Sequence, residues 1–522
     1  MTAIRTAEDI RQALLAGTEV ALLDVREEDP FAAGHPLWAA NLPLSRLELE
    51  AWSRLPRRDV AITLYDNGEG LAERAAERLH ALGYTDVALL DDGLAGWRAS
   101  GGELFIDVNV PSKAFGELVE ARRHTPSLPA EEVQALLEQD ADLVILDARR
   151  FEEYQTMSIP GGVSVPGAEL VLRVAELAPD PRTRVIVNCA GRTRSLIGAQ
   201  SLINAGIPNP VAALRNGTIG WTLAGQTLEH DQQRRFGAVS PATRATAAAR
   251  ARQVADRAGV ARLPFSELET WRSDAQRTNY LIDVRTPEEY AAGHLPGARS
   301  TPGGQLVQET DHSAPVRGAR LALVDDDGVR ANMSASWLAQ MGWAVAVVDD
   351  IPTSAMSATG PWQAPVPMPG PVERISVTRL QELLAEPGTL VVDVTASATY
   401  VQRHIPGAAW VLRADLPTQL PPAERYVCTC GSGQLAAFAA VDVQATTDRP
   451  VLLLEGGTAA WLAAGLPVEA GETRLLSIRR DRYRRPYEGT DAPREAMQAY
   501  LDWEFGLVEQ LRRDGTSGFR VI

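Results

Sequence analysis

The chain has 522 residues, of which 45% are hydrophobic and 23% charged, and its formal net charge is −16. This composition is that of a globular protein, and the length predicts roughly three to five domains. All but one of the 51 basic residues are arginine, and the single lysine, Lys113, has no Gly-Lys-Ser/Thr context. Phosphate-loop chemistry is therefore excluded, and Schiff-base chemistry is left with one unsuited lysine. The acidic balance argues against nucleic-acid or anionic-membrane partners.

The N-terminal segment and the cysteines indicate the expected cellular compartment and whether a metal is expected. Residues 1–24 mix Glu8 and Asp9 into their apolar positions, so we expect neither a secretory signal nor a membrane span. Three cysteines in so long a chain form no disulfide framework, which predicts a reducing cytoplasm. Cys428 and Cys430 stand too close together for the usual zinc pair and lack a histidine or cysteine cluster beside them. We expect no metal and no cofactor.

One unit is repeated four times. An apolar run ends in an aspartate in each copy, and these residues are Asp24, Asp147, Asp283 and Asp393. They lie roughly 110 to 140 residues apart, which is the size of a domain and too long for a solenoid repeat. We therefore expect four domains and a tail that holds a helix from Pro493 to Arg513. The expected ranges are 1–110, 125–232, 260–365 and 373–472 for the domains and 473–522 for the tail.

Further markers recur in the same order in the copies. An acidic stretch before tyrosine, as in Glu288–Tyr290, precedes a Pro-Gly turn such as Pro296–Gly297. A second apolar strand, a loop and a helix follow, and three copies close on a glycine turn before Trp97, Trp221 or Trp461. Short apolar strands that alternate with helical patterns predict an α/β fold. Each domain is expected to have a mostly parallel sheet with helices on both faces.

The loop that follows Val185–Asn188 in the second copy carries the strongest chemical signal. Its residues are Cys189, Ala190, Gly191, Arg192, Thr193, Arg194 and Ser195. A helix is expected from Ser195 to Ala205, so backbone N–H groups and a helix dipole point toward the cysteine. With two arginines nearby, Cys189 is predicted to have a lowered pKa and to react as a thiolate beside a bound anion. The alternative is a small buried cysteine without a chemical role.

This ordered set of motifs resembles the rhodanese family of sulfurtransferases over most of the chain. The resemblance implies four tandem rhodanese-like domains. It also implies that Cys189 attacks the outer sulfur of thiosulfate, becomes a persulfide, and passes the sulfur to cyanide or another thiol. The backbone amides from Ala190 to Ser195, together with Arg194, would hold the anionic donor. Whether Arg192 faces the substrate or the solvent stays open.

Two other functions remain as alternatives. Dual-specificity phosphatases, which are related by fold, place one residue more between cysteine and arginine than the four that separate Cys189 from Arg194. The shorter loop forms a smaller nest, which suits a persulfide sulfur better than a phosphate. The second alternative is a non-catalytic protein that senses redox state through Cys189 or serves as a partner-binding scaffold.

The other copies differ at the position of Cys189. Asp66 and Asp325 occupy it in the first and third copies. A carboxylate cannot carry sulfur and repels an anionic donor, so both domains are predicted to be catalytically silent, with structural or partner-binding roles. The fourth copy has Cys430 in a Cys-Gly-Ser-Gly loop that resembles mercaptopyruvate sulfurtransferases, but Gln434 and Leu435 supply no cation there. Cys430 therefore stays a secondary candidate whose activity is open.

Several polar residues are assigned to the fold. Arg149 is expected to pair with Glu152 or Glu153, and Cys428 is expected to be a core residue. The histidines of the Pro-Gly turns are expected to form structural hydrogen bonds; they are His35, His294 and His404. The arginine-rich stretch 479–486 is expected to be a solvated or interdomain ion-pairing face rather than a nucleic-acid site.

Overall fold

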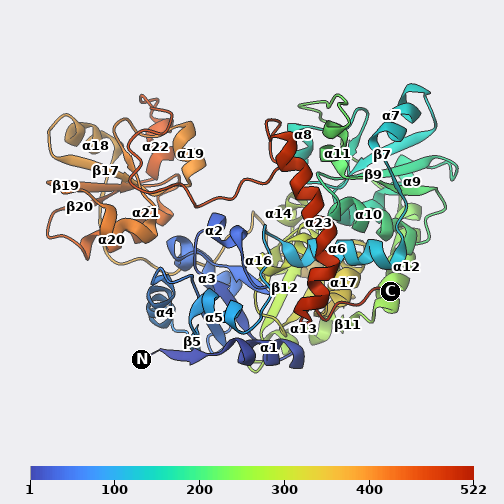
Figure 1. Ribbon diagram of the computed structural model, residues 1–522, viewed down its shortest axis with the longest axis horizontal. Coiled ribbons are helices and arrows are strands. Elements are labelled where there is room, and N and C mark those ends of the chain that lie inside the picture. Colours follow the sequence, from blue (N-terminus) through green and yellow to red (C-terminus); the bar gives the residue numbers. More distant parts are fainter. Residues whose placement is uncertain (1) are drawn as a thin grey trace.

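The computed structural model describes residues 2–522 and contains four α/β units in tandem (Figure 1). Each unit has a five-stranded sheet in which all strand pairs are parallel. Helices connect the strands and cover the sheets. The fold class expected from the sequence is confirmed.

The first unit has the strands β1 (Ala3–Arg5), β2 (Ala21–Asp24), β3 (Ala39–Asn41), β4 (Ile62–Tyr65) and β5 (Val87–Leu90). Its helices are α1 (Ala7–Ala16), α2 (Glu28–Ala33), α3 (Leu47–Arg54), α4 (Leu71–Ala81) and α5 (Gly93–Ala99). The strands lie in the order β1-β5-β4-β2-β3, and the other sheets repeat this order with their own strands. Helix α6 (Val110–Arg123) leads to the second unit.

The second unit has the strands β6 (Ser127–Leu128), β7 (Leu143–Asp147), β8 (Val163–Ser164), β9 (Arg184–Asn188) and β10 (Val211–Leu214). Its helices are α7 (Ala130–Glu138), α8 (Phe151–Thr156), α9 (Leu170–Leu177), α10 (Thr193–Asn204) and α11 (Gly217–Leu223). Helix α10 begins two residues before the position expected from the sequence. Its first turn is therefore part of the loop that carries Cys189.

The third unit has the strands β11 (Ala261–Pro264), β12 (Asn279–Asp283), β13 (Arg299–Ser300), β14 (Arg320–Val324) and β15 (Ala344–Asp349). Its helices are α13 (Leu268–Arg272), α14 (Pro287–Ala292), α15 (Gly303–Gln308), α16 (Thr310–Ser313) and α17 (Arg330–Gln340). The fourth unit has the strands β16 (Glu373–Ile375), β17 (Thr389–Asp393), β18 (Ala409–Trp410), β19 (Arg425–Thr429) and β20 (Val451–Leu454). Its helices are α18 (Val377–Leu384), α19 (Ser397–Gln402), α20 (Leu416–Gln419), α21 (Gln434–Gln444) and α22 (Gly457–Ala463).

The segment between the second and third units is a long helix, α12 (Pro241–Ala258), where the sequence indicated only a domain boundary. Its N-terminus is capped by Ser240, whose side chain accepts a hydrogen bond from the backbone of Thr243 at 3.2 Å. Ala251 and Val254 are buried and belong to the core cluster of the second unit. This connection is therefore part of the packed structure.

Each sheet is buried on both faces, as in the second unit. Val185, Ile186 and Val187 of β9 are all fully buried. Val185 and Val187 belong to one core cluster with Leu202 of α10, whereas Ile186 belongs to another with Trp221 of α11. Alternating side chains thus point to opposite faces, and a helix covers each face. This packing holds the carboxyl end of β9 rigidly at the edge where the cysteine loop begins.

The tail crosses the molecule and ends in helix α23 (Arg494–Asp514), one residue displaced from the expected range. Figure 1 shows this red helix lying across α6, and the fourth unit lying to one side of the other three. Met497, Leu501 and Leu511 of α23 are buried. Among residues 2–522, no helix is both long and apolar enough to cross a membrane. The buried residues of α23 pack partly against the second unit and partly against the first, so the tail covers both.

Candidate active site

Cys189 lies at the carboxyl end of β9, where the chain turns into α10. The first residues of α11 hold this turn, because the N–H groups of Thr218 and Ile219 donate to the carbonyl oxygens of Cys189 (2.9 Å) and Ala190 (3.0 Å). Gly217 has a φ of +54°, and a Cβ there would lie 2.2 Å from the Cys189 carbonyl oxygen. Only glycine fits such a position, which explains the glycine turn that closes the copy.

The Cys189 sulfur is held by the start of α10 and is hidden from solvent. The residue is 1% exposed, and its Sγ lies 3.4 Å from the Ser195 Oγ. That hydroxyl donates to the Arg192 carbonyl oxygen at 2.8 Å. Burial raises the pKa of the Cys189 thiol and outweighs the charge of Arg194 and the hydrogen bonds from Ser195, which act to lower it. The expected lowering of this pKa is wrong, because the loop is covered.

The guanidinium of Arg194 forms a bidentate ion pair with one carboxylate. Its two terminal nitrogens lie 2.7 and 2.8 Å from the Glu153 carboxylate oxygens. Burial alone would raise the pKa of Glu153, but Arg194 holds it at about 2. Arg194 is nearly buried, and its charge is felt at Cys189. Glu153 thus holds the arginine in a defined orientation, from which its charge acts to lower the pKa of Cys189.

The sequence predicted that Arg149 pairs with Glu152 or Glu153, but Glu153 pairs with Arg194 instead. Arg149 turns back onto the aspartate two residues earlier, and its Nη2 lies 2.8 Å from Asp147 Oδ2. The same nitrogen donates to the Met157 carbonyl oxygen at 2.6 Å. The short Asp-x-Arg spacing closes this ring within one turn, which leaves Glu153 free for Arg194. The structural role of Arg149 stands, but its expected partner is wrong.

Arg192 faces neither the solvent nor the sulfur. Its side chain is 4% exposed, and its Nε lies 2.7 Å from Glu117 on α6, with Glu120 as a second partner. Asn216 is a third partner and accepts a hydrogen bond at 3.1 Å, and the guanidinium lies 4.2 Å from the ring centre of Phe505. These contacts anchor the loop to α6 and to the tail. The Arg192 side chain is therefore occupied in anchoring the loop, whereas its backbone N–H stays among the amides of the nest.

The tail covers the cysteine loop, which sequence reasoning missed. Tyr487, Tyr500 and other apolar tail side chains form one buried cluster with Ala190. A Cβ on Gly191 would lie 3.0 Å from the ring of Tyr500, so glycine permits this close packing. Burial raises the pKa of Glu504 to about 8, and one of its oxygens accepts a hydrogen bond from Tyr500 at 2.9 Å. A carboxyl group whose ionised form is disfavoured by burial therefore lies against the loop.

The lone lysine fixes this cover in place. Lys113 on α6 is buried, and its Nζ lies 2.8 Å from Asp107 Oδ1. The same ammonium lies 5.5, 5.0 and 5.4 Å from the ring centres of Tyr487, Tyr500 and Trp503. Such cation–π contacts are strongest where water is excluded. The sequence shows that Lys113 is the one lysine among 51 basic residues. Nothing in the sequence connects this lysine with the aromatic residues of the tail.

The two copies without cysteine place a carboxylate in the same nest. In the first unit, Asp66 accepts hydrogen bonds from the backbone of Leu71 (2.5 Å) and Ala72 (3.0 Å). In the third unit, Asp325 accepts one from the backbone of Ala331 at 2.8 Å. Ala72 and Ala331 each stand six residues after the aspartate, as Ser195 stands after Cys189. The loop therefore directs backbone N–H groups at a side-chain oxygen in both units.

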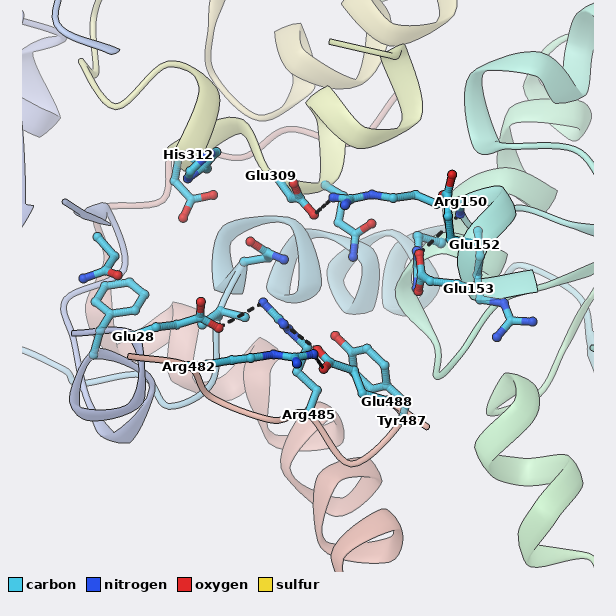
Figure 2. Close-up of a pocket in the computed structure, with 18 of the residues that line it drawn as sticks. Glu28, Arg150, Glu152, Glu153, Glu309, His312, Arg482, Arg485, Tyr487 and Glu488 are labelled. Atoms are coloured by element: carbon cyan, nitrogen blue, oxygen red, sulfur yellow. Dashed lines mark hydrogen bonds and ion pairs between the residues drawn. The ribbon is translucent and has the colours of Figure 1, made fainter. Parts of the chain in front are cut away.

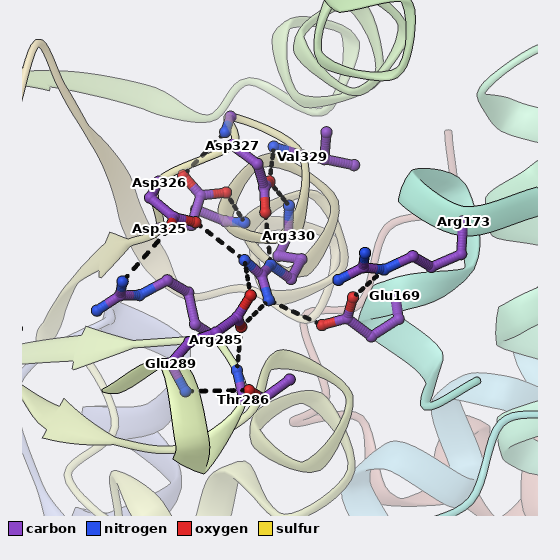
Figure 3. A network of polar contacts seen from close by, with 12 residues as sticks. Glu169, Arg173, Arg285, Thr286, Glu289, Asp325, Asp326, Asp327, Val329 and Arg330 are labelled. Carbon is purple, nitrogen blue, oxygen red and sulfur yellow. Dashed lines mark hydrogen bonds and ion pairs between the residues drawn. The ribbon is translucent and has the colours of Figure 1, made fainter. Parts of the chain in front are cut away.

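The third unit also keeps the arginine, but neutralises it internally (Figure 3). Arg330 pairs with Glu289 as Arg194 pairs with Glu153, and it also lies 2.6 Å from Asp327 and 2.9 Å from Glu169 of the second unit. Burial, reinforced by Asp327, raises the pKa of Asp325 well above its usual value. The positive charge of Arg330 is thus neutralised by carboxylates of the second and third units, which agrees with the prediction that the third unit is catalytically silent.

The fourth unit has the nest without the cation. Cys430 is 5% exposed, and the backbone N–H of Ala436 donates to its sulfur at 3.4 Å. Burial raises the pKa of Cys430, and only backbone hydrogen bonds act against it. Cys428 is fully buried in the core, and burial raises its pKa to about 12. Of these two thiols, only Cys430 lies in a loop that could bind a donor.

The fourth unit also lacks the arginine that neutralises its aspartate. Thr395 replaces it, so Asp393 keeps only a backbone hydrogen bond from Thr395 at 2.9 Å, and its Oδ2 is buried without a partner. Burial raises the pKa of Asp393 from 3.8 to about 7. Because the folded state holds this proton more tightly, the group costs stability increasingly as the pH rises from about 4 to 7, and the full cost remains above pH 7.

We therefore expect Asp393→Asn to stabilise the chain at pH 8, by up to about 4 kcal/mol, and to have little effect near pH 4. The amide removes the buried charge and keeps the oxygen that accepts from Thr395. Thermal unfolding of the full chain at both pH values measures this difference. The matched control is Asp283→Asn, which removes the partner of Arg285 (2.7 Å) and should destabilise at pH 8. A pH-independent effect of Asp393→Asn would contradict the account.

The turn histidines are structural, as expected from the sequence. His294 Nδ1 lies 2.8 Å from the Tyr290 carbonyl oxygen, and His404 Nδ1 lies 2.7 Å from that of Tyr400. Each imidazole also stacks on the tyrosine ring, with ring centres 3.7 and 3.8 Å apart. His35 forms the equivalent kind of contact through a backbone carbonyl of its own turn. None of these three rings lies beside Cys189.

Comparison with known proteins agrees with this architecture. The rhodanese-like domain family matches residues 6–100, 129–224, 265–350 and 376–464, which together make up more than half of the chain. The crystal structure of a thiosulfate sulfurtransferase from Pseudomonas aeruginosa is 73% identical, covers 100% of both chains and has a TM-score of 0.99.

Curated relatives match shorter stretches. A probable 3-mercaptopyruvate sulfurtransferase from Pseudomonas aeruginosa is 36% identical over 141 residues, which are 26% of this chain and 48% of the relative. An uncharacterised protein from Bacillus subtilis is 37% identical over 76 residues, which are 15% of this chain and 59% of the relative. The chain thus spans about half the length of the curated relatives it matches. Four family matches on four sheets of one topology place the chain in the rhodanese-like domain family.

Proposed function

We propose that the chain is a cytoplasmic sulfurtransferase that moves sulfane sulfur from thiosulfate or a related anionic donor to cyanide or a thiol through a persulfide on Cys189. The observation that carries this proposal is the nest around Cys189. The same loop holds a carboxylate in the first and third units, whereas the second unit presents a sulfur there with Arg194 beside it. The thiosulfate sulfurtransferase of the same architecture supports the choice of donor.

The first half-reaction begins with the Cys189 thiolate. It attacks the outer sulfur of thiosulfate, the sulfur–sulfur bond of the donor breaks, and the electron pair leaves with sulfite. Burial raises the pKa of the Cys189 thiol, so Arg194 and the Ser195 hydrogen bonds are needed to stabilise the thiolate. The persulfide that forms is itself anionic, and the amides from Ala190 to Ser195 would bind it as those of the first unit bind Asp66.

In the second half-reaction the acceptor attacks the outer sulfur of the persulfide. The Cys189 sulfur takes the electron pair of the broken bond and returns to the thiolate, which the same nest stabilises. Cyanide would leave as thiocyanate and a thiol as its persulfide. Cys430 is a second candidate carrier because its sulfur also receives a backbone N–H, although no arginine stands beside it.

Loading with thiosulfate in the absence of an acceptor tests the proposal. A burst of about one sulfite per chain is expected if Cys189 alone is active, and about two if Cys430 also reacts, since each persulfide releases one sulfite. Rapid quenching and sulfite quantification measure the burst. Its absence with all thiols reduced would refute thiosulfate as the donor and favour a sensing or scaffold role.

A further inference from the structure

The first and third units, which lack a cysteine, contribute to a large cavity beside the active site. The cavity measures about 740 Å³ and lies where these units meet the second unit and the tail. Arg46 comes from the first unit, His312 from the third, Arg194 from the second and Arg482 from the tail. Figure 2 shows the tail arginines on one side and the contact between Arg150 and Glu309 on another. Four parts of the chain thus enclose one space.

The cavity is larger than thiosulfate or cyanide requires. A water molecule takes about 30 Å³ of liquid volume, so the space corresponds to roughly 25 waters. Thiosulfate has five heavy atoms and would leave most of it unfilled. A volume of this size is typical of sites that enclose larger organic ligands, of about 300–1,000 Å³. The space therefore fits a substrate with a body beyond its reacting sulfur.

The charged residues that line the cavity indicate which kind of ligand it can bind. Seven arginines and six carboxylates line the cavity, so both signs are presented to a ligand. Arg482 pairs with Glu488, and Arg46 pairs with Glu50 at 2.9 Å, but their side chains are still 52% and 38% exposed, so each guanidinium can make a further contact. Burial raises the pKa of Glu28 and raises that of Asp311 to about 6, and a ligand ammonium nearby would favour their ionised forms. A zwitterionic ligand matches this wall better than a simple anion.

Two lining residues connect the cavity with the cysteine loop of the second unit. Arg194 lines it, and the charge of this arginine is felt at Cys189. Tyr487 also lines it and packs in one buried cluster with Ala190 of the loop. A ligand held in the cavity would therefore contact Arg194 and Tyr487, the two lining residues that connect it with the cysteine loop.

We propose that this interdomain cavity binds the sulfur acceptor, and that the acceptor is a low-molecular-weight thiol of amino-acid or peptide type carrying both carboxylate and ammonium groups. The inference rests on the proposed function. The acceptor thiolate attacks the outer sulfur of the Cys189 persulfide, the persulfide bond breaks, and its electron pair returns to Cys189. The silent units supply substrate-binding residues, among them Arg46.

Competition between a charged and an uncharged thiol tests the inference. Glutathione and 2-mercaptoethanol are compared as acceptors with thiosulfate as donor, and kcat/KM is corrected for the thiolate fraction of each. We expect the wild-type chain to favour glutathione by at least about tenfold, and Arg46→Gln and Arg482→Gln each to lower that ratio about five- to tenfold by removing a charge-assisted contact. The matched control is Arg182→Gln, an 87% exposed arginine of the second unit outside the cavity, which should keep the ratio.

The outcomes separate this inference from the proposed function. A wild-type ratio near one, or a ratio that neither cavity variant changes, would overturn the acceptor site while sulfur transfer itself continues. Failure of the wild-type chain to transfer sulfur to any acceptor, cyanide included, would overturn the proposed function. Arg46 and Arg482 lie in different parts of the chain, so misfolding of one variant, detected by its thermal unfolding, leaves the other to decide.

Discussion

Replacement of Cys189 by serine is expected to lower thiosulfate–cyanide turnover by about 10³-fold or more. The hydroxyl is a far weaker nucleophile than a thiolate and cannot form a persulfide. The change is nearly isosteric, and Ser195 can still bond to the new oxygen, so the fold should persist. Thiocyanate formation by the purified variant measures the loss, and thermal unfolding checks the fold.

The other two cysteines supply the matched controls. Cys428→Ser alters a core thiol and should leave the Cys189 reaction intact if the chain still folds. Cys430→Ser removes the second candidate carrier and is expected to keep most of the turnover, because its nest has no arginine. Wild-type turnover in Cys189→Ser, or its loss in Cys430→Ser alone, would show that the reaction runs through the fourth unit.

Replacement of Arg194 by leucine is expected to raise the KM for thiosulfate about 10- to 100-fold, as the loss of a preorganised charge at an anion site does. It should also move the acid limb of the pH profile of kcat/KM to higher pH. The sign follows from the Cys189 thiol: Arg194 acts to lower its pKa, so without the arginine the thiolate forms only at higher pH. Initial rates from pH 6 to 10 measure both effects.

Replacement of Arg194 also leaves the carboxylate of Glu153 without its partner, which costs stability independently of donor binding. A second substitution at Glu153 separates the two effects. The double change of Arg194→Leu with Glu153→Gln removes both charges and should restore stability but not the KM. Arg194→Lys keeps the charge without the bidentate geometry and should fall between wild type and leucine. A leucine variant with an unchanged KM and pH profile would remove Arg194 from the donor site.

Much of the fold follows from local patterns in the sequence. The aspartates that end apolar runs do end β2, β7, β12 and β17, and the loop of Cys189 does enter a helix N-terminus. These features depend on neighbours in the chain, and they recur in each copy. The helix α12 was missed because its alanine-rich sequence shows little apolar periodicity, and its apolar face became evident only with α9 and α17 packed on it.

The environment of the site could not be predicted in the same way. The cover over the cysteine loop is formed by tail residues such as Tyr487 and Tyr500, which pack with Ala190 although they lie more than 290 positions away in the chain. The turn of Arg192 toward Glu117 and the pairing of Arg194 with Glu153 depend on how α6 and α8 pack against the loop. Short-range spacing predicted Cys189 as the candidate nucleophile, whereas long-range packing determines how the side chains of Arg192 and Arg194 are oriented.

The central claim is that Cys189 carries the sulfur, and the mass of that cysteine after loading with thiosulfate tests it most directly. Under non-reducing digestion, the peptide that contains Cys189 should gain about 32 Da, one sulfur atom, and should lose it when cyanide is added. Sulfite release without this gain on Cys189, or a gain confined to the peptide that contains Cys428 and Cys430, would contradict the account.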